Sequence, residues 1–206
     1  MFWLIVGGIW MTAYLLGSIP TGYIIAKLLR GIDIREHGSG NTGATNVFRV
    51  VGKTAGSLVL LIDILKGASA VLIAQQVAQV ATLSGSAWLM TGSGLLAILG
   101  HSKSVWLGFS GGKSAATGLG ILLALAWPVG LATATVFAII LAGSRFVSLS
   151  SIAAAIAAPL LMLLTSQPLP FTLLAAAGGI YVIIRHRSNI NRLLSGTEPK
   201  IGTPTA

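Results

Sequence analysis

Two short glycine-rich polar segments interrupt a chain that is otherwise mostly apolar. The first runs from Gly38 to Asn46, and the second is Gly111-Gly112-Lys113-Ser114. Successive small residues let the backbone turn tightly and direct several N–H groups to one point, which suits an anion. A cationic side chain accompanies each segment, since Arg49 follows the first and Lys113 belongs to the second. These residue types favour chemistry on a phosphate group.

Each segment resembles a nucleotide-binding motif without the context that the motif requires. The first matches G-x-G-x-x-G and has Asp63 beyond it, but no strand pattern precedes it and Asp63 falls in an apolar stretch. The second resembles a P-loop, but Leu107 stands where that loop needs glycine, and no carboxylate partner for magnesium follows. Nucleotide chemistry is therefore not expected. A tight interhelical turn and a small-residue loop with an interfacial lysine are the simpler alternatives for the two segments.

The composition is that of a membrane protein. Hydrophobic residues make up 54% of the 206 residues, charged residues make up 8%, and the mean hydropathy is +0.89. A soluble domain of this size needs more charge to cover its surface. The basic residues behind the net charge of +9 are scattered, so a nucleic-acid partner is not expected. We expect a single transmembrane domain over residues 1–206.

The apolar stretches predict an all-α integral membrane protein with about seven transmembrane helices, for which about 20 residues each are typically needed. Pro20 could kink the first stretch. The region from Ser114 to Ala142 could form two short helices that turn at Pro128 or one bent helix. The expected helices are Phe2–Leu28, Ala55–Ala78, Ser86–Leu99, Ser114–Trp127, Val129–Ala142, Ile152–Thr165 and Phe171–Ile184.

The basic residues predict the orientation of these helices. Of the 13 Lys and Arg residues, five lie between Lys27 and Lys53, two are Lys103 and Lys113 in one loop, one is Arg145, and four follow from Arg185. These are alternate connections if there are seven helices, and only Lys66 lies within a helix. The positive-inside rule then places the N-terminus outside and the tail, about 185–206, in the cytoplasm. Six helices would put Arg145 on the opposite side. Four polar connections would thus meet at the cytoplasmic face.

Acidic residues and histidines limit the possible chemistry. Asp63 and Lys66 are three residues apart and share one helix face, where a functional pair and a purely structural pair are equally good interpretations. The four acidic residues form no ligand cluster with the three histidines, so we expect neither a metal nor another cofactor. The absence of cysteine excludes a cysteine acyl-enzyme. The His-x4-Asp pattern of many acyltransferases is missing, because the residues five positions after His37, His101 and His186 are Thr42, Trp106 and Asn191.

Over most of its length the chain resembles the bacterial integral-membrane, acyl-phosphate-dependent glycerol-3-phosphate acyltransferases, the PlsY family. Two positions differ from the usual family pattern: Ser104 lies near a usual proline, and Ser114 stands where glycine is usual. The segments that carry the resemblance are Gly38–Asn41 with Gly43–Asn46, Leu61–Gly67, Gly100-His101 with Phe109 and Gly111–Lys113, Arg145 with Ser148 and Ser151, and Arg185–Ile190.

The resemblance implies a seven-helix fold in the bacterial cell (inner) membrane with its site facing the cytoplasm. It implies transfer of an acyl chain from acyl phosphate to the 1-hydroxyl of sn-glycerol 3-phosphate. Phosphate is a good leaving group, so positioning and charge neutralisation can supply most of the rate. We expect a site without carboxylates, because these would repel both anionic substrates. The phosphate of the acceptor could itself take the hydroxyl proton.

The resemblance also assigns roles to residues. It implies catalytic roles for Ser39, Lys113, His186 and Asn189. It implies substrate binding by Gly40, Asn41, Thr45, Asn46, Arg49, Gly111, Gly112, Ser148 and Ser151.

A membrane transporter of phosphate or an organophosphate is the alternative from another class. A transporter favours polar or broken segments near the middle of the bilayer and often two related halves. Here the polar segments are expected at one face, and the sequence has no internal repeat. The acyltransferase is therefore the favoured interpretation.

Overall fold

A computed structural model describes residues 2–202, and within them the chain is all-α. The prediction of an all-α chain is confirmed. Its α-helices are α1 (Phe2–Ser18), α2 (Thr21–Arg30), α3 (Ala44–Val50), α4 (Lys53–Val80), α5 (Ser86–Ser102), α6 (Ala115–Leu125), α7 (Trp127–Ser144), α8 (Val147–Leu164), α9 (Leu169–Arg185) and α10 (Arg187–Leu194); the 3-10 helices are η1 (Ile34–Glu36) and η2 (Val105–Leu107).

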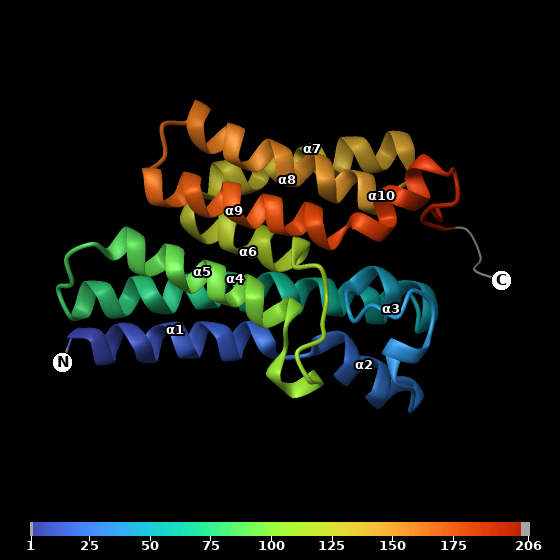
Figure 1. Ribbon diagram of the computed structural model, residues 1–206, viewed down its shortest axis with the longest axis horizontal. Coiled ribbons are helices and arrows are strands. Elements are labelled where there is room, and N and C mark those ends of the chain that lie inside the picture. Colours follow the sequence, from blue (N-terminus) through green and yellow to red (C-terminus); the bar gives the residue numbers. More distant parts are fainter. Residues whose placement is uncertain (1, 203–206) are drawn as a thin grey trace.

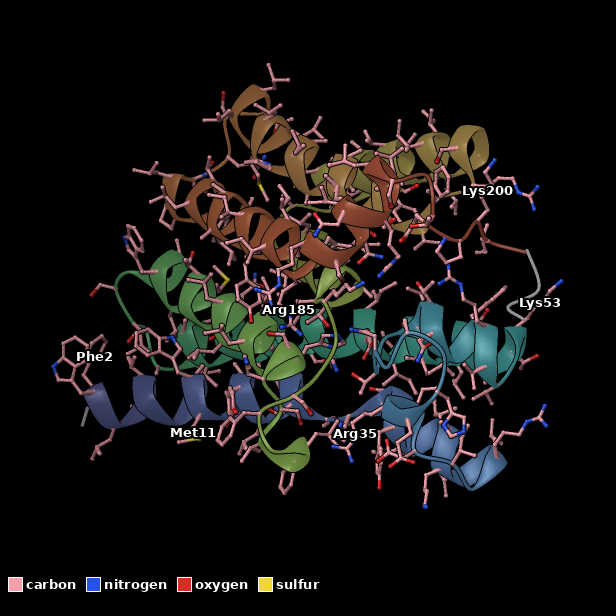
Figure 2. All side chains as sticks on the ribbon, turned by 45° about the vertical axis from the view of Figure 1, so that its right-hand side comes forward. Phe2, Met11, Arg35, Lys53, Arg185 and Lys200 are labelled. Atoms are coloured by element: carbon pink, nitrogen blue, oxygen red, sulfur yellow. The ribbon has the colours of Figure 1, made fainter. Side chains whose placement is uncertain are left out.

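The longer helices run side by side, and the short helices gather at one end of the bundle (Figure 1). The N-terminal end of α1 lies at the opposite end from the short helices α3 and α10. With side chains drawn, Phe2 lies at one end, whereas Lys53 and Lys200 lie at the other (Figure 2). The arrangement places the short helices α2, α3 and α10 together at one end of the bundle.

Several segments are long and apolar enough to cross a membrane. By length and composition there are four among the described residues: Phe2–Arg30, Lys53–Val80, Trp127–Ser144 and Val147–Leu164. Helices α9 and α10, bent by 58° at His186, supply a fifth if they are counted together, and α6 is apolar but shorter. Large apolar side chains such as Leu4, Val80 and Leu164 are exposed on the outside of the bundle, as lipid contact requires. The number of seven crossings stays a prediction.

The helix ends differ from the expected ones by a few residues in general, and two regions differ in a more informative way. The first expected helix is not continuous, because α1 ends at Ser18 and α2 begins at Thr21 after Pro20, which has no N–H to donate to a helix. In the region 114–142 the structure has two helices, α6 and α7. They part at Ala126, whose φ of −152° is not helical, and Pro128 occupies the first turn of α7. Proline is well accommodated there, because N–H groups of the first turn have no partner within the helix.

Small residues allow α4 and α6 to pack closely. A Cβ atom added at Gly67 would lie 2.2 Å from the carbonyl oxygen of Thr117, and one added at Gly120 would lie 1.9 Å from that of Ile64. Glycine is therefore required at both positions, as is common where membrane helices approach. This contact fixes the start of α6, and with it the segment that carries Lys113, against the middle of α4.

Candidate active site

One cavity of about 330 Å³ joins the glycine-rich segments to the interior of the bundle. Its apolar wall comes from α6, α7, α8 and α9 and includes Leu119, Leu122, Phe137, Ala158, Ala175 and Val182. Its polar wall comes from the segment 39–49, the start of α6, α8, α10 and the C-terminal segment. Polar and charged side chains on this wall are Ser39, Asn41, Thr45, Asn46, Arg49, Lys113, Ser148, Ser151, His186, Asn189, Arg192 and Glu198. Asp63, His101 and Thr133, from α4, α5 and α7, line the cavity as well.

Most of the candidate residues from the sequence therefore meet at this cavity. All four candidate catalytic residues line it, and both Ser148 and Ser151 do so as well. Gly40, Gly111 and Gly112 are not among the lining residues. Their contribution is to the backbone path of the two segments, as in Gly40, whose φ of +68° lies in the region that favours glycine.

Asn46 organises the first glycine-rich segment. The side chain is buried, and its Oδ1 accepts a hydrogen bond from the backbone N–H of Ser39 at 2.9 Å. Its Nδ2 donates to the carbonyl oxygens of His37 at 3.0 Å and Asn41 at 2.9 Å. Both ends of the amide are thus engaged within the segment. Asn46 holds Ser39 at the cavity wall.

Lys113 reaches across the cavity to α10. Its Nζ donates a hydrogen bond to Oδ1 of Asn189. Burial is the main cause that lowers the pKa of Lys113 to about 8; the positive charges of Arg192, Arg185 and Arg49 act in the same direction, and Glu198 opposes them. A lysine in this environment gains from a bound anion, because the anion restores a favourable partner for its charge.

His186 lies where α9 ends and α10 begins. Its Nδ1 is 2.7 Å from the carbonyl oxygen of Val182, so Nδ1 carries the proton and donates it there. The Nε2 of a neutral imidazole then has a free lone pair. Burial lowers the pKa of His186 to about 4, and the positive charge of Lys113 acts in the same direction. His186 is therefore suited to accept a hydrogen bond but is a weak base.

Glu198 is a site residue that the sequence reasoning missed. Its Oε1 accepts hydrogen bonds from Oγ of Ser148 and Nδ2 of Asn189, both at 2.7 Å, and its Oε2 is 2.7 Å from Nε of Arg192. Burial opposes its ionisation, but these donors hold the pKa of Glu198 below its usual value. The expectation of a site without carboxylates is wrong. The charge is tolerated because Arg192 neutralises it locally.

The C-terminal segment is held at the cavity by further contacts. Nη2 of Arg49 donates to the carbonyl oxygen of Pro199 at 3.0 Å. Arg145 and Ile201 exchange two hydrogen bonds, one from the backbone N–H of Ile201 at 2.8 Å and one from the Arg145 guanidinium at 3.1 Å. The segment that carries Glu198 is therefore fixed to α3 and to the start of α8. No sequence pattern predicted this return of the tail.

Asp63 and Lys66 form the pair that their spacing suggested. Nζ of Lys66 lies 2.9 Å from Oδ1 of Asp63 and donates a second hydrogen bond to the carbonyl oxygen of Ile19 at 3.0 Å. Both side chains are buried. The second contact ties α4 to the break between α1 and α2, so the pair has a structural role in holding that break.

The fold and the cavity together define a class of protein. Arg49, Lys113 and Arg192 supply positive charge on one wall, and the opposite wall is suited to a hydrocarbon chain. The molecule is thus a helical membrane protein whose site fits a ligand with both a phosphate and an apolar chain. The model of the glycerol-3-phosphate acyltransferase family matches residues 8–196. The chain therefore belongs to this family.

Curated glycerol-3-phosphate acyltransferases match the whole chain or nearly all of it. The chain is 52% identical to the glycerol-3-phosphate acyltransferase of Gloeobacter violaceus over 210 residues, an alignment that covers 100% of both chains. It is 57% identical to that of Trichormus variabilis over 207 residues, which covers 95% of this chain and 92% of the relative.

Two solved structures of one member of this family also match the fold of the chain. The crystal structure of PlsY, an integral membrane glycerol 3-phosphate acyltransferase, in its glycerol 3-phosphate form has a TM-score of 0.88 and 42% sequence identity, and the match covers 96% of each chain. The form with lysophosphatidic acid has a TM-score of 0.85 at the same identity and coverage. The family resemblance of the sequence is confirmed, and the chain is a multi-pass integral membrane protein.

Proposed function

We propose that this chain transfers an acyl group from acyl phosphate to the 1-hydroxyl of sn-glycerol 3-phosphate, giving lysophosphatidic acid and inorganic phosphate. The observation that carries the proposal is the cavity with one cationic wall and one apolar wall. It suits an acyl donor whose chain lies among α6 to α9 and whose phosphate lies near Lys113. The relatives are named for the same acceptor.

The residue roles follow from their places on the cavity wall. Arg49 and Lys113 neutralise the two anionic substrates through charge-assisted hydrogen bonds. Ser39, Asn41 and Thr45 hold one phosphate together with backbone N–H groups at the start of α3. Ser148 and Ser151 complete the wall on α8, and Asn189 orients Lys113.

The reaction needs little from an acid or a base in the protein. The acceptor hydroxyl attacks the acyl carbon, the C–O bond to the donor phosphate breaks, and phosphate leaves with the electron pair of that bond. Nε2 of His186 can accept a hydrogen bond from the hydroxyl and orient it, but its low pKa makes it a poor proton acceptor. The proton goes instead to a phosphate oxygen of the substrates. Positioning and charge neutralisation supply the rate.

We further propose that α1, α4, α5, α6, α7, α8 and α9 are the seven crossings of one domain. Most connections that hold basic residues lie at the end of the bundle near α3 and α10, and the connection between α5 and α6 lies nearer the middle of the view (Figure 1). The positive-inside rule then places this end in the cytoplasm and the N-terminus outside. In a bacterium this is the cell (inner) membrane. A reporter fused after Ala206 is expected in the cytoplasm and one inserted near Pro168 outside; both on one side would contradict the topology.

Transport of phosphate is the alternative that one assay separates from this proposal. Purified protein in detergent has no two compartments, so a transporter consumes no substrate there. We expect the purified protein to convert acyl phosphate and labelled glycerol 3-phosphate into labelled lysophosphatidic acid. Loss of acyl phosphate without labelled lipid, or no reaction with a folded sample, would contradict the proposed function.

A further inference from the structure

His101 is a buried side chain that the proposed reaction does not use. It lies in the last turn of α5, and its Nδ1 is 3.6 Å from Oδ1 of Asp63. Its backbone oxygen accepts a hydrogen bond from the N–H of Gly112 at 3.1 Å. His101 therefore stands between the Asp63–Lys66 pair on α4 and the glycine-rich segment that precedes Lys113.

The imidazole ring occupies the space that a side chain at position 112 would need. A Cβ atom added at Gly112 would lie 2.0 Å from Nε2 of His101, and one added at Gly111 would lie 2.3 Å from the His101 carbonyl oxygen. Neither glycine has a positive φ angle. Glycine is thus required at position 112 because of the contact with the ring, and the backbone conformation alone would accept alanine.

Arg185 holds the same segment from the other side. Its Nη2 lies 3.3 Å from the carbonyl oxygen of Gly111 and 3.2 Å from that of Gly112 and donates to both. Arg185 is half-buried and lies near the centre of the view in Figure 2, away from the exposed Lys53 and Lys200. The peptide groups before Lys113 are therefore held by His101 at the end of α5 and by Arg185 at the end of α9.

We propose that His101 is a positioning residue. Its ring, which contacts Asp63, fixes the position of the Gly112 backbone and thereby directs the Lys113 side chain into the cavity. This inference rests on the proposed function, because it assigns the cause of Lys113 placement in that reaction. His101 also lines the cavity, but the effect proposed here is exerted through the position of Lys113. Displacement of a reacting group by about 1 Å can cost about 100-fold in rate, so a rigid support under this segment has a direct effect on activity.

A size exchange between the two residues tests the contact. Gly112→Ala should lower kcat/KM by at least about tenfold, because the added methyl group pushes the segment off the ring. His101→Ala in the same protein makes room for the methyl group. We expect the double variant to be at least about fivefold more active than the product of the two single effects, a coupling typical of residues in contact. Effects that simply multiply would overturn the proposal.

A second double-mutant cycle, of His101→Ala with Lys113→Ala, tests whether His101 acts through Lys113. If it does, Lys113→Ala should reduce activity much less in His101→Ala than in the wild type, and the apparent KM for glycerol 3-phosphate should rise in both single variants. A purely structural role predicts instead that the two losses multiply and that a lower melting temperature in detergent accounts for the loss in His101→Ala. That outcome would also overturn the proposal.

Two matched controls isolate the contact. Thr91→Val removes another buried polar group from α5 that has no hydrogen-bond partner among the described residues. Gly143→Ala adds a methyl group where nothing lies within 4 Å. Both should keep wild-type activity. If the wild type makes no lysophosphatidic acid, the proposed function fails; if it does and either cycle shows no coupling, only the positioning inference fails.

Discussion

Oγ of Ser148 donates a hydrogen bond to Oε1 of Glu198 at 2.7 Å, across 50 residues of sequence. The contact joins the start of α8 to the C-terminal segment and places a carboxylate on the wall of an anion-binding cavity. Its charge is balanced by Arg192 at 2.7 Å. The tail thus closes one side of the cavity with a carboxylate whose charge has a cationic partner.

Changes at Glu198 should affect stability in a graded way. Glu198→Ala leaves buried donors of Ser148 and Asn189 without an acceptor, which typically costs about 1–3 kcal/mol. Glu198→Gln can keep one oxygen as the acceptor for both donors, but it loses the charge and the oxygen that accepts a hydrogen bond from Arg192. We expect the melting temperature in detergent to fall more for alanine than for glutamine. Equal melting temperatures for all three proteins would contradict the account of the tail.

The lowered pKa of Lys113 predicts a pH dependence. In the free protein Lys113 loses its proton as the pH rises through about 8, and the neutral amine no longer attracts an anion. A bound phosphate favours the charged form. The value of kcat/KM should therefore fall above pH 8, while kcat holds to higher pH. Initial rates from pH 6.5 to 9.5 measure both, and a kcat/KM that stays flat across this range would exclude the role given to Lys113.

The loss of activity on replacing a cationic residue should depend on whether that residue lines the cavity. Lys113→Ala and Arg49→Ala each remove a charge from the cavity wall, and a charge-assisted hydrogen bond is about twice as strong as a neutral one. Lys103 is exposed and does not line the cavity, so it is the matched control. We expect the first two variants to lose much more activity than Lys103→Ala. The loop assignment fails if Lys103→Ala is as damaging as Lys113→Ala.

Chelation of metal ions should leave the activity unchanged. Three of the four acidic residues are paired with cations, namely Asp33 with Arg35 at 2.6 Å, Asp63 with Lys66 at 2.9 Å and Glu198 with Arg192 at 2.7 Å. Such carboxylates are poor ligands for Mg²⁺ or Ca²⁺. Rates with and without EDTA should agree, and a loss that added Mg²⁺ reverses would show that the site needs a metal.

The sequence predicted the helical architecture because apolar stretches of this length leave few alternatives in a membrane. It predicted helix ends less well. Proline marks a boundary only approximately, as Pro128 illustrates: it lies inside the first turn of α7, and the chain breaks at Ala126. Pro20 does lie at a break, but whether such a residue kinks or ends a helix depends on packing partners that the local sequence does not contain.

For the site, residues that are polar within an apolar chain could be predicted, and residues that act through distant contacts could not. Lys113 and Arg49 stood out by type and place. The part played by Glu198 depends on the return of the tail to Ser148, and that of Asn46 on hydrogen bonds within a folded loop. Both relationships exist only in three dimensions, so spacing along the chain carries no sign of them.

The choice of acyl donor tests the central claim most directly. Lys113, Arg49 and the glycine-rich segments are arranged to bind a phosphate that is also the leaving group, and with no cysteine and no His-x4-Asp pattern the chain has no evident means to help an alcohol displace a thiolate. We therefore predict that purified protein acylates glycerol 3-phosphate from palmitoyl phosphate and not measurably from palmitoyl-CoA at matched concentrations in detergent. Comparable rates from the two donors would contradict the account.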